Sequence, residues 1–139
     1  MLFRLETQII ISSSAPKVWE ILMDFEGYPS WNPFIKHISG VATRGNTINI
    51  ELGGMKFKPE VQELKQNQKF SWLGKLFLKG LFDGNHEFII EVIDGKTVVF
   101  HQNESFSGIL VPFLKNKLKK ETKTGFQEMN QALKERCEK

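Results

Sequence analysis

Apolar and polar residues alternate over positions 3–11, which is the period-two pattern of a strand with one buried face. Pro16 then suits the first turn of a helix, where its missing N–H costs nothing. Apolar residues over 18–25 recur at intervals of three and four, as on one helical face. The residues expected to end this helix are Gly27 and Pro29. A second short helical turn is expected over 31–36.

Strand patterns dominate the middle of the chain. Alternating or β-rich segments are separated by turn residues such as Gly53-Gly54 and Asn67. The expected strands cover residues 47–52, 55–64, 69–76, 85–93 and 97–106. Together with the first strand these make six segments of a predicted antiparallel sheet, which we expect to have about seven strands in all.

The last two of these strands form a hairpin through Asp94-Gly95. A two-residue loop would place their apolar residues on opposite faces, whereas an odd-length loop or a bulge places them on one face. Burial of a common face favours the second register. In that register His86 opposes Glu104 and Phe88 opposes Gln102, so a polar pair lies on an otherwise apolar surface.

A long amphipathic helix is predicted from about residue 109 to 136, with Pro112 in its first turn. At 1.5 Å per residue it is about 40 Å long, enough to cross a whole sheet. Gly125, on or beside the apolar stripe, is kept for close packing or for room. The stripe consists of Leu114, Leu118, Thr122, Phe126, Met129 and Leu133.

The order of elements predicts one α+β domain over residues 1–139, because no repeat, linker or composition shift divides the chain. A curved sheet cannot press its whole concave face against one straight helix. A gap is therefore expected between sheet and helix, and concave apolar gaps bind small ligands.

The segment DFEGYPSWNPFI, residues 24–35, is unusually rich in large apolar side chains for a loop. Its rings either line a ligand cavity or fill the space between the short helices and the sheet as ordinary core. The sequence leaves both interpretations open.

The chain resembles the SRPBCC/START-like helix-grip superfamily, and within it the bacterial polyketide cyclase/dehydrase-like branch. The matching segments are APKVWEILMDFEGYPSWNPFI (15–35), GMKFKPEV (54–61), FSWLGKL with GLFDGNHEF (70–88), and ESFSGILVPFL with GFQEMNQAL (104–133). The resemblance implies a helix-grip fold, with the sheet wrapped around the C-terminal helix and two short helices after the first strand. It also implies that Trp31 and Phe34 line or cap the mouth of the grip.

The function expected from this resemblance is binding of a small hydrophobic or amphipathic ligand, such as a lipid, a quinone or a polyketide-like molecule. The expected apolar wall is Trp31, Phe34, Phe57, Trp72, Phe88, Phe106 and Met129, and the orienting polar groups are His86, Gln102 and Glu104. One alternative is a cyclase or dehydrase in which His86 and Glu104 carry protons. The simpler interpretation is that this pair satisfies its own hydrogen bonds. The related cyclases use arginine and tyrosine in the cavity, whereas here the one tyrosine is Tyr28 and the arginines occupy surface-like positions.

A second alternative is a membrane- or quinone-associated accessory protein, similar to the accessory member of this superfamily in the carbon monoxide dehydrogenase system. The apolar segment Phe77–Phe82 is expected to be a lid, a membrane-touching tip, a dimer contact or plain core. The lysines of the last helix are either a solvated face or a contact for an anionic surface. These lysines are Lys115, Lys117, Lys119, Lys120 and Lys123.

Composition narrows the remaining classes. No apolar run approaches the roughly 20 residues of a membrane span, and no signal-peptide pattern is present. The single Cys137 excludes an intramolecular disulfide and fits a cytoplasmic setting. The net charge of +3 comes without a nucleic-acid-binding motif, so no nucleic acid is expected. The three histidines lack metal-ligand spacing, and no cofactor motif occurs, so neither a metal nor a cofactor is expected.

Overall fold

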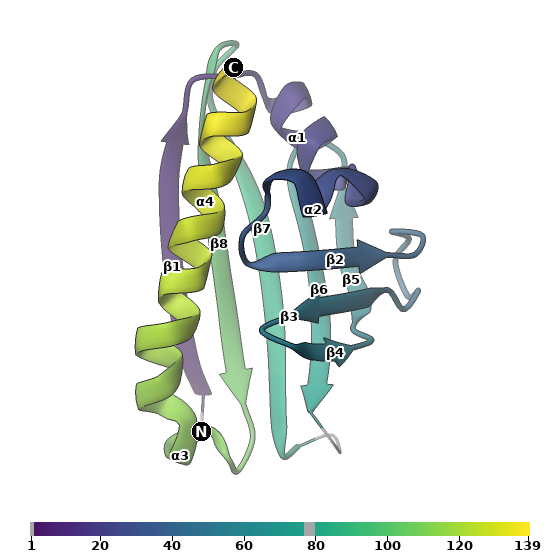
Figure 1. The fold of residues 1–139 in the computed structure, drawn as a ribbon, viewed down its shortest axis with the longest axis vertical. Coiled ribbons are helices and arrows are strands. Elements are labelled where there is room, and N and C mark those ends of the chain that lie inside the picture. Colours follow the sequence, from purple (N-terminus) through teal and green to yellow (C-terminus); the bar gives the residue numbers. More distant parts are fainter. Residues whose placement is uncertain (1, 77–79) are drawn as a thin grey trace.

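A five-stranded antiparallel sheet forms the curved wall of the molecule in the computed structural model, which describes residues 2–76 and 80–139 (Figure 1). Its strands, in spatial order, are β1 (Leu2–Ile11), β8 (Thr97–Ser107), β7 (Phe82–Asp94), β6 (Lys69–Leu76) and β5 (Glu60–Lys65). The alternation seen in the first eleven residues is confirmed, because Leu5, Thr7 and Ile11 are buried.

A second sheet of three short strands crosses in front of the first (Figure 1). It consists of β2 (Ile35–Ser39), β3 (Asn49–Leu52) and β4 (Met55–Phe57). The single strand predicted over 55–64 is therefore wrong. Pro59 lies between β4 and β5, has no N–H for a ladder, and separates strands of two different sheets.

Of the two short helices after β1, the first begins as predicted and the second begins earlier than predicted. Helix α1 (Ala15–Met23) starts after Ser14, whose hydroxyl accepts a hydrogen bond from the Lys17 N–H, and Pro16 lies in its first turn. A 3₁₀ turn (Phe25–Gly27) then leads directly into α2 (Tyr28–Trp31). The helical turn predicted over 31–36 is wrong in place, since 35–39 is a strand.

The proline in this segment accounts for that shift. Pro29 occupies the first turn of α2. A proline there needs no hydrogen-bond partner for its nitrogen, so it begins this helix instead of ending the previous one.

The predicted C-terminal helix is confirmed in extent, with one irregularity. It consists of α3 (Val111–Lys117), a π-helical turn (Leu118–Thr122) and α4 (Lys123–Glu138), and α4 lies along the concave side of the large sheet (Figure 1). The apolar stripe faces inward, because Phe126, Met129 and Leu133 are fully buried. Gly125 is buried where an added Cβ would overlap the ring of Phe34.

The β7–β8 hairpin has the predicted register. Its pairing shifts between Val92 and Asp94, which is the bulge that burial of one common face requires. His86 consequently pairs with Glu104 and Phe88 with Gln102. The hairpin thus delivers three polar side chains to the concave face.

Candidate functional site

His86 lies in an aromatic surround on the concave face of β7. Its imidazole stacks on Trp72 of β6, with ring centroids 4.7 Å apart and an interplanar angle of 9°. The rings of Phe88 and Phe126 meet it edge to face at 4.8 and 4.9 Å. His86 is 2% exposed, so its two nitrogens depend on protein partners.

Both nitrogens have such a partner on β8. His86 Nδ1 lies 2.7 Å from Glu104 Oε1, and His86 Nε2 lies 3.0 Å from Gln102 Oε1. The three side chains therefore act as one hydrogen-bonded unit across two strands.

The unit continues into the C-terminal helix and the first strand. Gln102 Nε2 donates to Asn130 Oδ1 at 2.8 Å and to the backbone oxygen of Phe126 at 3.3 Å. Asn130 Nδ2 donates to Thr7 Oγ1 at 2.9 Å, and the Thr7 hydroxyl donates to the backbone oxygen of Gln102 at 2.7 Å. These bonds tie α4 to β1, β7 and β8.

Glu104 is the member of this unit that reaches solvent, with 17% of its side chain exposed. Its second oxygen, Oε2, points to the backbone of Gly84, where an added Cβ would overlap it. Gly84 pairs with Gly74 of β6, so two neighbouring strands have no side chain at this level. Glycine inside a strand often marks close approach of a ligand or of another group.

The residues expected to form the apolar wall occupy two environments. Trp72, Phe88 and Met129 are buried in the main core cluster, and Phe106 is buried in a second cluster beside Val111 and Leu118. Trp31, Phe34 and Phe57 are partly exposed at the edge of these clusters. Four residues between the sheet and α4 are fully buried: Phe70, Phe88, Met129 and Leu133. At these residues the expected gap is filled by side chains.

Rings of the segment DFEGYPSWNPFI pack on that core. Phe25 stacks on Phe70 at 6.0 Å, and Phe34 meets Phe126 edge to face at 5.5 Å. The Tyr28 hydroxyl donates to the Leu22 backbone oxygen at 2.6 Å, and burial raises the pKa of this phenol. Of the two interpretations of this segment, core packing describes these contacts.

Three members of the polar unit were not predicted as site residues: Thr7, Asn130 and Phe126. Thr7 stands at a buried position of an apolar alternation, and Asn130 follows Met129 within the helical stripe. A polar residue at a position that must be buried was the available signal, because such residues need a partner. Nothing in the pattern specified which partner.

The molecule carries a comparable His–Glu contact on the opposite face of the hairpin. His101 Nε2 lies 2.8 Å from Glu91 Oε1, and 56% of the Glu91 side chain is exposed. The predicted register places His101 on that face. The two contacts differ in burial, since His86 is enclosed by rings.

Surface hollows occur away from this unit. One of about 310 Å³ lies over the small sheet beside His37, Glu51 and Lys56, and another of about 450 Å³ lies beside Arg44, Gln62 and Asn85. Among residues 2–76 and 80–139, no group of three His, Cys, Asp or Glu side chains is placed to hold a metal ion. No helix in this part of the chain has the length and apolar character needed to cross a membrane.

The segment Phe77–Phe82 is described only in part, because residues 77–79 lie outside the described residues. Gly80 has a positive φ of 92°, and Phe82 stacks on Phe106 at 5.5 Å. The described end of the segment thus joins the second core cluster.

Comparison with known proteins places this arrangement in a wider group. The family model described as polyketide cyclase/dehydrase and lipid transport matches residues 3–138. Among curated proteins, none matches the chain.

Solved structures share the fold at low sequence identity. A hypothetical protein from Helicobacter pylori superposes with a TM-score of 0.83 at 18% identity, covering 97% of this chain and 88% of that one. A START superfamily protein from Mycobacterium smegmatis gives 0.73 at 21% identity, with 97% of each chain covered. The Zhui aromatase/cyclase from Streptomyces sp. R1128 gives 0.77 at 12% identity, covering 99% and 94%. At these identities the similarity establishes the helix-grip fold.

Proposed function

The chain belongs to the polyketide cyclase/dehydrase and lipid transport family, and on that premise we propose that it binds a small hydrophobic or amphipathic ligand on the concave face of its sheet. The proposed anchor is the His86–Glu104 pair, with Glu104 in contact with the ligand. The partly exposed rings of Phe34 and Phe57 cover the apolar part of the ligand.

One observation supports this proposal above the others. Only 17% of the Glu104 side chain is exposed, yet its second carboxyl oxygen receives no hydrogen bond from any described residue. Among the described residues the buried side-chain nitrogen or oxygen without a partner is Asn32 Nδ2, so Glu104 Oε2 keeps access to solvent and is available to accept a hydrogen bond from a ligand. The absence of a side chain at Gly84 lets this oxygen lie against the strand, because a Cβ there would overlap it.

Native mass spectrometry of the purified protein tests this function. A lipid or polyketide-like molecule retained on the protein, and identified in an organic-solvent extract, is the expected result. An unliganded mass that does not change on incubation with a library of apolar compounds contradicts the proposal.

The alternative of a cyclase or dehydrase uses the same pair, and Glu104→Gln separates the two functions. The amide side chain can still accept a hydrogen bond from a ligand, so a binding protein keeps most of its affinity. An enzyme that moves protons through this carboxyl group loses turnover, typically by a factor of about 100 or more.

A membrane-associated function has its own support at one end of the molecule. Phe113, in the first turn of α3, is 82% exposed, and Ile109, two residues before α3 begins, is 67% exposed. The lysines of the α3–α4 helix follow directly, and two of them, Lys115 and Lys119, lie over the ring of Phe3 at 5.4 and 5.9 Å. Exposed apolar side chains beside lysines are suited to an anionic lipid surface.

A further inference from the structure

The hydrogen bonds behind His86 run in one direction, which two backbone oxygens determine. The Phe126 oxygen can only accept, so the side-chain group of Gln102 that faces it is the NH₂. That NH₂ also donates to Asn130 Oδ1, which leaves the Asn130 NH₂ to donate to Thr7 Oγ1. The Thr7 hydroxyl in turn donates to the Gln102 backbone oxygen. Reversing any amide would place two NH₂ groups or two oxygens against each other.

This direction fixes the proton on the far nitrogen of His86. Gln102 Oε1 is the atom 3.0 Å from His86 Nε2, and an amide oxygen has no hydrogen to give. His86 Nε2 therefore carries a hydrogen and donates it. The neutral imidazole with its hydrogen on Nδ1 alone is excluded, because it would leave two acceptors facing each other.

The near nitrogen then shares one proton with Glu104. A 2.7 Å contact between Nδ1 and Oε1 requires a hydrogen between them. Either the imidazolium donates it to a carboxylate, or a carboxylic acid donates it to a neutral imidazole. In both arrangements the proton lies on the Oε1 side of Glu104, and Oε2 carries none.

We infer that Glu104 Oε2 is a fixed hydrogen-bond acceptor, so that this site selects apolar ligands carrying a hydroxyl or N–H donor over ketones, quinones and ethers. The inference rests on the proposed function and narrows its ligand class. A phenol or alcohol satisfies Oε2, whereas the oxygen of a quinone or ether would face another acceptor. A site built for a donor rejects analogues that lack it, because its own polar atom is left unpaired.

The direction of these hydrogen bonds can be measured without any ligand. Imidazole ¹⁵N spectra of the protein should show His86 Nε2 as a protonated nitrogen across the pH range in which the protein is folded. A lone pair on Nε2 would overturn the inference. Because this measurement uses the unaltered protein, it does not depend on the folding of a variant.

Ligand selectivity is measured by titration calorimetry with three probes: 2-naphthol, 2-methoxynaphthalene and naphthalene. The phenol should bind about tenfold more tightly than naphthalene, as expected for a hydrogen bond to a charged or strongly polarised oxygen, and the ether should gain nothing. Glu104→Met should abolish the preference. Glu91→Met removes the carboxyl of the His–Glu contact on the opposite face and serves as the matched control, which should keep it.

Two other outcomes separate this inference from the proposed function. Equal affinity for the three probes would overturn the donor selectivity and leave apolar binding in place. No binding of any probe, together with an unliganded mass in native mass spectrometry, would overturn both.

Discussion

At Gly84 the chain has no room for a side chain, because a Cβ there would overlap Glu104 Oε2. We expect Gly84→Ala to displace the carboxyl group from His86 and to lower the free energy of unfolding by about 1–3 kcal/mol, because a buried imidazole nitrogen then loses its partner. Gly74→Ala is the matched control, since its Cβ would meet the Phe57 ring at 3.7 Å and the Gly84 backbone oxygen at 3.9 Å, which are ordinary contacts. Urea unfolding of both variants checks the difference, and equal losses would contradict the crowding at Gly84.

Glu87, on the outer face next to His86, makes the fold sensitive to acid. Partial burial opposes ionisation, but hydrogen bonds from Asn103 and Arg4 and the charges of Arg4 and Lys69 hold the pKa of Glu87 below its usual 4.5. A carboxyl group whose pKa is lowered on folding stabilises the protein at pH values above its unfolded-state pKa. This stabilisation is lost as the pH falls through the folded-state pKa. Glu87→Gln should therefore cost stability at pH 7 and progressively less below about pH 4.5. Urea unfolding at pH 7 and pH 3 measures this, and a cost independent of pH would contradict it.

Some residues of the site could be predicted from the sequence and others could not. His86, Gln102 and Glu104 could be placed on one face because strand alternation and burial determine a hairpin register. Asn130 and Thr7 could not be joined to them, because a helix stripe gives the face of a residue but not its height along the sheet. The amide orientations that determine the proton of His86 depend on those contacts and need the structure.

Among the helices and strands, the wrong predictions of element bounds occur at prolines that can take either of two structural roles. Pro29 begins α2 and Pro59 separates β4 from β5, whereas the pattern alone had them ending a helix and lying within a strand. The strand β2 was missed because it begins soon after α2, at Ile35, and has two buried residues, Ile35 and Ile38, spaced by three instead of two. The register of the β7–β8 hairpin was predicted correctly because two strongly apolar strand faces demanded it, and a bulge between Val92 and Asp94 is the one of the two expected devices that produces it.

The labelling rate of the Cys137 thiol measures how firmly the C-terminal end of α4 packs against the rest of the protein. Burial raises the pKa of this thiol to about 11, with a smaller opposing effect of Lys17 and a reinforcing one of Glu138. Only the thiolate reacts with iodoacetamide, so labelling at pH 8 should be at least about a hundredfold slower than in urea-unfolded protein. Leu133→Ala, one turn earlier on the same face, should loosen α4 and speed labelling. Labelling of the native protein at the unfolded rate would contradict a docked helix end.

The raised pKa of Cys137 also gives a direction for alkaline pH. A thiol whose pKa is raised on folding contributes stability below the unfolded value of 9.0, and this is lost as pH rises toward 11. Cys137→Ser should therefore reduce the loss of stability between about pH 8 and pH 10, as measured by thermal unfolding. An unchanged slope would mean that the thiol is equally exposed in both states.

For the whole molecule, the α+β class followed from the order of elements, because one long amphipathic helix and a run of antiparallel strands leave few ways to bury their apolar faces. The helix-grip arrangement was expected from the resemblance of the matching segments to that superfamily. The filling of the gap between them could not be predicted in the same way. It depends on how the rings of α2, β6 and β7 interlock, as in the stacking of Phe25 on Phe70. Hydrophobic periodicity records which side chains face inward, not how completely they fill the space.

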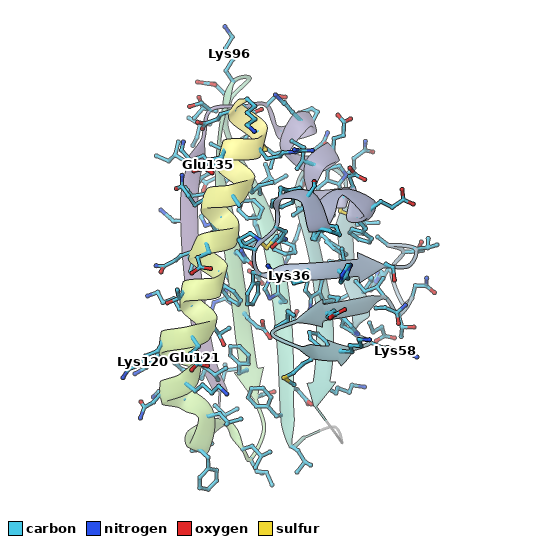
Figure 2. The ribbon with its side chains drawn as sticks, in the orientation of Figure 1. Lys36, Lys58, Lys96, Lys120, Glu121 and Glu135 are labelled. Carbon is cyan, nitrogen blue, oxygen red and sulfur yellow. The ribbon has the colours of Figure 1, made fainter. Side chains whose placement is uncertain are left out.

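The two ends of the molecule differ in a way that predicts an orientation on membranes. Figure 1 shows α3 and the N-terminus at one end and the β7–β8 hairpin at the other, and in Figure 2 Lys120 lies toward the first end and Lys96 at the second. Exposed Phe113 and the adjacent lysines are at the α3 end. Vesicles containing phosphatidylserine should therefore bind this end, more strongly at low salt, because the Debye length falls from about 10 Å at 0.1 M to 3 Å at 1 M.

Paired substitutions at the two ends make that prediction specific. Phe113→Ser removes the most exposed ring of the α3 end, and Ile93→Ser removes an apolar side chain that is 56% exposed at the hairpin end. Vesicle sedimentation should show weaker binding for Phe113→Ser and unchanged binding for Ile93→Ser, since only Phe113 lies beside the lysines of the α3–α4 helix. Equal losses for both variants, or equal binding to uncharged phosphatidylcholine vesicles, would mean that the α3 end is not a membrane contact. The lysines would then be the solvated face of a helix whose partner is water.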